Sequence, residues 1–173
     1  MIQIAAYQGK SFISRLIRWQ TRSKFSHIAI RFTEDIWVNL GGREKYIHAG
    51  NVIEAWKGGV RMATNISESH DPGTRVDFFE FVEPLTQEET QTMASFLVRQ
   101  IGKGYDYLAI VRFLTRDPIS HWQKTKWFCS ELAFETSLTA GRNLLERTDA
   151  WRVPPDWIPR SPLLRPAGHE ITR

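Results

Sequence analysis

The chain's one cysteine, Cys129, stands in the stretch KWFCSELAFE, between two aromatic residues and what reads as the first turn of a helix. A thiol becomes a useful nucleophile when its pKa falls, and the unpaired N–H groups and dipole of a helix N-terminus favour the thiolate. The same N–H groups can bind the oxyanion of an acyl-transfer intermediate. The position of Cys129 therefore predicts a catalytic thiolate, against the simpler alternative of a small buried core residue.

A nucleophilic thiol also needs a base, and His27 is the best candidate. It lies in FSHIAIRF, on the polar side of an alternating pattern and next to the small residues Ser26 and Ala29. A third polar side chain would then orient the imidazole and select its tautomer. Taken alone, a histidine on a strand is more often structural than catalytic, so the pair depends on what positions it.

The elements that must position these residues follow from the hydrophobic pattern, which has period 2 in the first half and helical spacing after it. Thr86 and Glu89 form a candidate capping box for the first helix of the second half. Strands are predicted over 2–8, 25–32, 35–42, 46–56 and 75–85, with turn signals at Gly41-Gly42 and Gly50-Asn51. Helices are predicted over 11–24, 86–101, 105–114 and 129–140. The proline-rich segment 153–166 is expected to run irregularly over the surface. Strands followed by helices predict an α+β domain with an antiparallel sheet, and no linker divides residues 1–173.

Segment 11–24 is both amphipathic and basic. Phe12, Ile13, Leu16 and Ile17 share one helical face, and the other side carries Arg15, Arg18 and Arg22. A helix of this kind usually packs its apolar face on the core. The alternative is attachment to a membrane surface.

The segments SHIAI and, much later, FCSEL resemble the permuted branch of the NlpC-type papain-like cysteine hydrolases, which includes the YiiX-like proteins and, more distantly, the lecithin–retinol acyltransferase group. In that branch the histidine precedes the cysteine in the chain. Further segments are similar in the same order: VIEAWKGGV, GYDYLAI and VPPDWIPRSPLL. The resemblance covers about residues 8–165, and Ala29 replaces the family's usual glycine.

The resemblance implies a papain-like fold, with a central antiparallel sheet or small barrel packed against helices. It implies a thiol hydrolase (an amidase, peptidase or lipid acyl hydrolase) or an acyltransferase, with Cys129 as nucleophile and His27 as base. The expected substrate is a small molecule, a peptide or a lipid that carries an acyl group. Glu54 in VIEAWKGGV is the expected orienting residue, and His48 in YIHAG is its rival. The side chains expected near a substrate are Tyr105, Ser130 and Trp56.

Composition limits the other possibilities. The net charge is +4, and 42% of the 173 residues are hydrophobic, as in a soluble globular domain. The basic residues are scattered among acidic ones, so no nucleic-acid partner is expected. We expect no cofactor, since nucleotide-binding glycine motifs are missing, and no metal, since no histidine or cysteine pair has metal-ligand spacing.

One cysteine and no evident signal sequence favour the cytoplasm. A catalytically inactive binding module of the same fold and a membrane-surface lipid-binding protein are the alternatives to an enzyme.

Overall fold

The computed structural model describes residues 1–68, 70–107 and 125–173, and they form a mixed α+β fold around a six-stranded antiparallel sheet. The sequence predicted this class and the antiparallel sheet. In order across the sheet, the strands are β10 (Leu164–Ile171), β7 (Arg75–Phe81), β1 (Ile2–Gln8), β2 (His27–Phe32), β5 (Val52–Trp56) and β6 (Gly59–Ala63). The helices are α1 (Phe12–Thr21), α2 (Gln87–Gln100) and α4 (Cys129–Thr139).

The alternating pattern of β2 decides which side chains face the helices. Ile28, Ile30 and Phe32 belong to the large core that also contains residues of α2 and α4. Ala29 belongs to a second, smaller cluster that also contains Tyr7. His27 alternates with Ile28 and so projects on the side of Ala29, as predicted.

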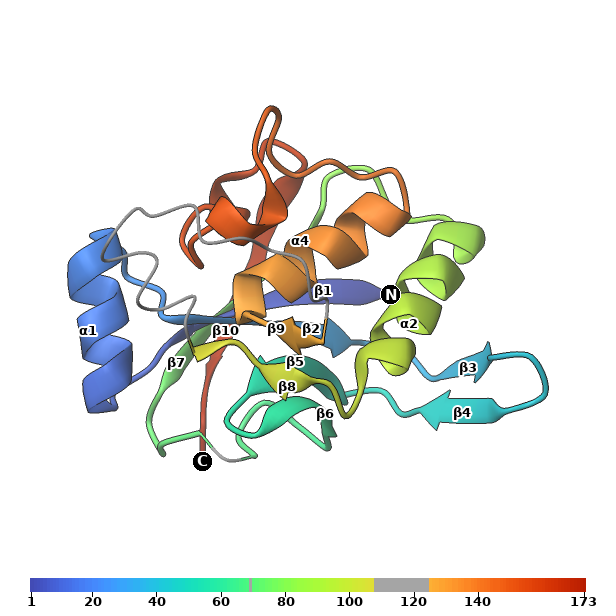
Figure 1. Cartoon of the computed structure of the whole chain (residues 1–173), viewed down its shortest axis with the longest axis horizontal. Helices are drawn as coiled ribbons and strands as arrows, with labels where there is room; N and C mark the ends of the chain where they lie inside the picture. Colours follow the sequence, from blue (N-terminus) through green and yellow to red (C-terminus); the bar gives the residue numbers. More distant parts are fainter. Residues whose placement is uncertain (69, 108–124) are drawn as a thin grey trace.

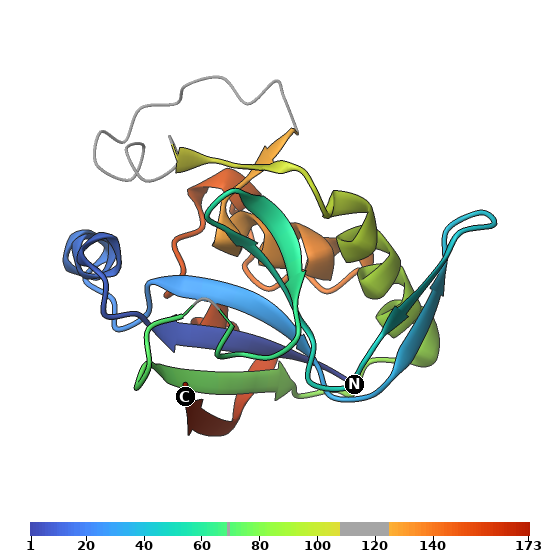
Figure 2. The same ribbon diagram turned by 90° about the horizontal axis from the view of Figure 1, so that it is seen from below.

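The helices do not cover the sheet evenly. Helices α2 and α4 lie side by side on one face, whereas α1 stands at the opposite end of the molecule from the hairpin of β3 (Ile36–Asn39) and β4 (Glu44–Ile47) (Figures 1 and 2). Helix α4 contacts β2 and β5. Its first residue is Cys129, so the N-terminus of this helix carries the thiol to the strands that carry His27 and Glu54.

The capping box predicted for α2 is present. The hydroxyl of Thr86 accepts the N–H of Glu89, and the Glu89 carboxylate accepts the N–H of Thr86 at 2.7 Å. Glu89 also accepts two hydrogen bonds from Arg142, which lies just beyond the end of α4. One carboxylate therefore both caps α2 and ties it to α4.

Several expectations need correction. Residues 46–56 form two strands, β4 and β5, and the turn between them at 48–51 contains the predicted turn signal Gly50-Asn51. Strand β6 was not predicted. The proline-rich segment 153–166 is less irregular than expected, because it contains the short helix η2 (Ile158–Arg160) and leads into β10. Another short helix, η1 (Ala150–Arg152), comes directly before it. Pro166 is accommodated because β10 is an edge strand whose register shifts between Pro166 and Gly168. The expected helix 105–114 falls mostly outside the described residues.

The remaining short strands, β8 (Gly104–Tyr105) and β9 (Lys126–Trp127), form a parallel pair that borders α4 in the sequence. Strand β8 contacts β5 and β6. Within the described ranges, no helix combines the length and the apolar character needed to cross a membrane.

Candidate active site

His27 lies where two neighbouring strands separate. It is paired with Tyr7 of β1, whereas the ladder between β2 and β5 consists of Ile30 with Ile53 and Arg31 with Val52. The ladder to β5 therefore ends before His27 is reached. The start of helix α4 approaches β2 at this opening.

Cys129 lies against the backbone next to His27. The backbone N–H groups of Ile28 and Ser130 lie close enough to its sulfur to lower the thiol pKa. Ile28 belongs to β2, and Ser130 belongs to the first turn of α4. The thiol is 2% exposed, and Phe128 and Tyr105 pack around it. The fold thus brings the cysteine to the residue that follows His27, although about a hundred residues separate them in the chain.

The surroundings of Cys129 favour the protonated thiol, and not the thiolate that the helix start led us to expect. Burial raises the pKa of Cys129 to about 12, and the N–H groups of Ile28 and Ser130 lower it by less than burial raises it. The prediction of a preformed thiolate was therefore wrong, because it considered the effect of the helix N-terminus on the thiol pKa and not the larger effect of burial. At neutral pH the sulfur carries its proton.

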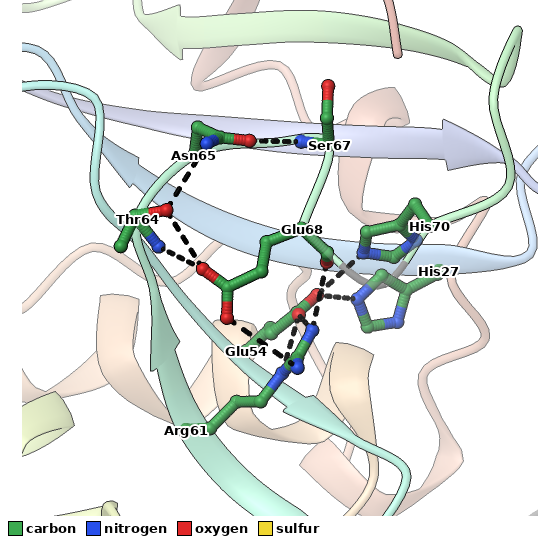
Figure 3. A network of polar contacts seen from close by, with 8 residues as sticks. All are labelled: His27, Glu54, Arg61, Thr64, Asn65, Ser67, Glu68 and His70. Atoms are coloured by element: carbon green, nitrogen blue, oxygen red, sulfur yellow. Dashed lines mark hydrogen bonds and ion pairs between the residues drawn. The ribbon is translucent and has the colours of Figure 1, made fainter. Parts of the chain in front are cut away.

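Glu54 is the residue that holds His27. Nε2 of His27 lies 2.7 Å from Oε2 of Glu54, and their side chains are 3% and 1% exposed. The other carboxylate oxygen, Oε1, accepts hydrogen bonds from Nε and Nη2 of Arg61 at 3.0 and 2.6 Å (Figure 3). Arg61 is directly opposite Glu54 in the β5–β6 ladder, so the hairpin itself supplies this cation.

These contacts determine the protonation of the histidine. Burial would raise the pKa of Glu54, but hydrogen bonds from His27 and His70 outweigh it, and the carboxyl pKa falls well below its usual range. Burial lowers the pKa of His27, against the opposing effect of Glu54, so the imidazole is neutral at pH 7. A carboxylate can only accept, so Nε2 of His27 carries the proton. Its Nδ1 is then the free base.

A second histidine, His70, shares the same carboxylate oxygen, and sequence reasoning missed it. Nε2 of His70 lies 3.1 Å from Oε2 of Glu54 (Figure 3). The loop that carries His70 is anchored from β6, because Nη2 of Arg61 donates to the backbone carbonyl of Glu68 at 3.0 Å. No local pattern marks His70, since its position depends on these contacts between β6 and the loop.

The positions of Glu54 and His48, the two candidates for the residue that orients His27, distinguish between them. His48 lies in the turn between β4 and β5, exposed, with its ring 4.5 Å from that of Tyr46 and its N–H bonded to Asn51. The carboxylate beside His27 belongs to Glu54.

The residues expected near a substrate have different surroundings. Trp56 packs edge-on against His27, with ring centroids 4.7 Å apart, and Tyr105 packs against the cluster of Phe128 and Cys129. The hydroxyl of Ser130 is buried and donates to the carbonyl of Val153 at 2.5 Å. Ser130 therefore offers its backbone N–H, rather than its hydroxyl, to the sulfur.

Folding also assembles a donor set that sequence spacing did not reveal. One nitrogen each of His27 and His70 and one oxygen of Glu54 all lie within 4.8 Å of one another. The expectation that this chain offers no metal-ligating group was based on spacing along the chain, which does not register residues from β2, β5 and a later loop.

Comparison with known proteins places the fold. No protein-family model matches the chain. No curated protein sequence matches it either. Among solved structures, it matches the one described as metalloprotein YiiX from Escherichia coli O157:H7, with a TM-score of 0.64 and 18% sequence identity, over 97% of this chain and 96% of that one. The chain therefore has the YiiX fold along nearly its whole length, in agreement with the resemblance seen in its sequence.

Proposed function

We propose that this protein is a cysteine-dependent hydrolase or acyltransferase that cleaves an amide or ester bond through a thioester. Cys129 is the nucleophile, His27 the base and Glu54 the orienting residue. The observation that carries the proposal is the 2.7 Å contact between His27 and Glu54. The thiol of Cys129 lies near the backbone of Ile28, the residue after His27, whose N–H lowers the thiol pKa. A permuted papain-like architecture is part of the proposal, and the order of histidine strand before cysteine helix supports it.

The neutral resting pair implies how the reaction begins. Nδ1 of His27 takes the thiol proton as the sulfur attacks the acyl carbonyl, so that the C–S bond forms while the S–H bond breaks. Negative charge then develops on the carbonyl oxygen. The N–H groups at the start of α4 are suited to stabilise it. The imidazolium returns its proton to the leaving amine or alcohol, and the thioester remains on Cys129.

The second half of the reaction repeats these roles. Nδ1 of His27 takes a proton from water, or from another acceptor, which attacks the thioester carbon and expels the sulfur. Glu54 keeps the imidazole in the Nε2–H tautomer throughout and stabilises the imidazolium when it forms. Hydrolysis and transfer differ in the acceptor alone.

Burial of the thiol sets a condition on substrate access. Because Cys129 is 2% exposed, an acyl group reaches the sulfur only when the side chains around it shift. Tyr105 packs on the cluster of Phe128 and Cys129, and Trp56 packs on His27. Both rings are aromatic, so the approach to the thiol suits an apolar acyl chain or a peptide with apolar groups.

The test is a screen of acyl-amide and acyl-ester libraries, with the wild type compared with Cys129→Ala. Intact-protein mass spectrometry should trap an acyl adduct on Cys129 with a slowly turned-over ester, and the adduct should be absent in Cys129→Ala. Cleavage that persists in Cys129→Ala would refute the thioester mechanism. A folded wild type that neither turns over nor acquires an adduct would favour the inactive binding module.

A second candidate function, attachment to an anionic membrane surface, is supported by helix α1. Phe12 was expected in the core but is 81% exposed, and Trp19 is 75% exposed. These two aromatic residues are seven apart and so share a helix face, with the exposed Arg15 between them. An exposed face that combines aromatic and arginine side chains suits the lipid–water interface.

The charge distribution favours the same partner. Residues 1–33 hold six lysines and arginines and no acidic residue, whereas the remaining seventeen basic and nineteen acidic residues leave that part of the chain at −2. The positive charge therefore gathers around α1, which stands apart from the sheet (Figure 2). Each basic residue near an anionic bilayer contributes about 1 kcal/mol of attraction.

Vesicle co-sedimentation tests this attachment. The wild type should sediment with phosphatidylserine-containing vesicles and not with pure phosphatidylcholine vesicles, and a double variant Phe12→Ser, Trp19→Ser should lose most of the binding. Trp37→Ser is the matched control, because Trp37 is also exposed, at 62%, but lies on the β3–β4 hairpin. Equal sedimentation of both variants would exclude α1 as the membrane-binding element.

A further inference from the structure

The cluster of His27, Glu54 and His70 is unusual because both histidines contact the same carboxylate oxygen of Glu54, and all three side chains are buried. The distances from Oε2 of Glu54 are 2.7 Å to His27 and 3.1 Å to His70. The side chain of His70 is 4% exposed, and the other two are buried as well. An orienting carboxylate for a catalytic histidine needs one imidazole on that oxygen, so the second one calls for a separate explanation.

The surroundings hold these donors in place. Arg61 occupies the outer oxygen, Oε1, and thereby turns Oε2 toward the two nitrogens. Tyr7 stacks on His70, with ring centroids 4.2 Å apart and planes 22° from parallel, and Trp56 packs on both histidine rings. Outer residues that bond a ligating carboxylate and fix imidazole rings are typical of metal centres.

We propose that His27, Glu54 and His70 bind one divalent transition-metal ion, through Nε2, Oε2 and Nε2 respectively. Two imidazoles and one carboxylate form a donor set that suits zinc, and three protein ligands leave a position for water. The three elements involved are β2, β5 and the loop after β6, so the site exists only in the folded chain.

The arrangement of donors fits such an ion. Bonds of about 2.0–2.2 Å to nitrogen and oxygen place ligand atoms about 3–4 Å apart around zinc. The three donor atoms lie within 4.8 Å of one another, so small movements of the two rings would suffice. The hydroxyl of Tyr7, which is opposite His27 in the β1–β2 ladder, is buried and has no hydrogen-bond partner among the described residues. The site thus contains one polar group that the described side chains do not satisfy.

Binding would have a consequence for the thiol chemistry, and this consequence alone rests on the proposed function. A metal on Nε2 of His27 takes the place of the proton on that nitrogen, and the neutral imidazole then carries its proton on Nδ1, which can no longer accept the thiol proton. The metal-bound protein should therefore be inactive toward acyl substrates, and a chelator should restore activity.

The experiment measures binding itself, by titrating Zn²⁺ into the metal-free full-length chain in a calorimeter, without any substrate. We expect one equivalent to bind, with affinity reduced at least tenfold in both His70→Ala and His27→Ala. Cys129→Ala tests whether the thiol is a ligand, and His48→Ala is the control for an exposed histidine elsewhere. Both should bind as the wild type does.

Cobalt provides an independent spectroscopic measurement. Co²⁺ bound to nitrogen and oxygen donors should give visible d–d absorption, without the thiolate-to-cobalt charge-transfer band that a cysteine ligand produces. Circular dichroism of each metal-free variant establishes that it is folded, and Glu54→Gln provides a third ligand variant if one histidine variant is not. Absence of binding to the wild type would overturn the proposal. Binding that survives in folded His27→Ala and His70→Ala, or is lost in Cys129→Ala, would overturn it too. Neither result depends on whether the protein cleaves an acyl substrate.

Discussion

Nε2 of His27 and Oε2 of Glu54 lie 2.7 Å apart, although 27 residues separate them in the chain. Both groups are almost fully buried, and the carboxylate is held from its other side by Arg61. A hydrogen bond in this setting leaves Nδ1 as the single free nitrogen of the ring. That orientation is the physical basis of the proposed acyl chemistry.

The first prediction concerns the tautomer of His27. Glu54→Gln should shift the imidazole away from the Nε2–H form, because the amide NH₂ can donate where the carboxylate only accepts. Nitrogen-15 NMR of the histidine rings should report the change directly. With an acyl substrate from the screen, kcat should fall by about 10²–10⁴-fold.

The matched control for that prediction is His48→Ala, since His48 lies in an exposed turn away from Glu54. It should leave both the His27 spectrum and turnover unchanged. A large loss of activity in His48→Ala with a tolerated Glu54→Gln would reverse the assignment of the orienting residue.

The second prediction concerns the thiol itself. Because burial raises the pKa of Cys129 to about 12, the rate of iodoacetamide labelling of the native protein should rise about tenfold per pH unit between 7 and 10. A free cysteine with a pKa of about 8.5 levels off within that range. Quenched labelling followed by mass spectrometry gives both rates. Labelling faster than free cysteine at pH 6–7 would show instead a thiolate–imidazolium pair at rest.

The third prediction concerns the glycine that lets β8 approach β6. Gly59 has a φ of +135°, and a Cβ there would lie 2.3 Å from the carbonyl oxygen of Lys103. That same carbonyl accepts the N–H of Val60 at 2.7 Å and so places the segment that leads to Tyr105. Gly59→Ala should lower the free energy of unfolding by about 2–4 kcal/mol, through backbone strain and the clash with Lys103.

Gly58→Ala is the control for the clash at Gly59. Gly58 also has a positive φ, of +90°, but no atom lies within 4 Å of the position of its Cβ. The cost there should be about 1–2 kcal/mol, from the backbone conformation alone. Urea denaturation of the two variants compares them, and equal losses would mean that the Lys103 carbonyl moves aside freely.

The fourth prediction is a pH dependence of stability. Hydrogen bonds from Arg142, and then from the N–H of Thr86, lower the pKa of Glu89 to about 2 from its usual 4.5. A carboxyl whose pKa is lower in the folded state stabilises above its unfolded pKa, and loses that contribution as pH falls through the folded value. Glu89→Gln should therefore be less stable than the wild type at pH 6, with the difference shrinking between about pH 4.5 and 2.

Urea melts at several pH values measure that difference. Glu88→Gln is the control, because Glu88 is in the same helical turn but is not the residue that Arg142 contacts. A Glu89→Gln deficit that stays constant down to pH 2 would mean that the carboxylate charge does not contribute.

Much of the fold was readable from the sequence, because its signals are local. Alternation in residues 27–32 identified the strand and placed His27 on the opposite side from Ile28. Thr86 and Glu89 marked the start of α2, because they form a capping box and are only three residues apart in the chain. Cys129 was correctly expected at a helix start. In each case the deciding interaction lies within a few residues of chain, so the pattern of types is sufficient.

Other features were decided by tertiary structure alone. His70 reaches Glu54 because Arg61 holds both the carboxylate and the loop that carries His70, and nothing in the loop's own sequence states this. Helix position by itself predicts a lowered thiol pKa, but burial of Cys129 reverses the direction. Desolvation depends on every neighbour brought in by folding, and the meeting of β2, β5 and a later loop depends on long-range pairing. Local sequence can supply the chemical groups, but only the packed chain determines their protonation and their partners.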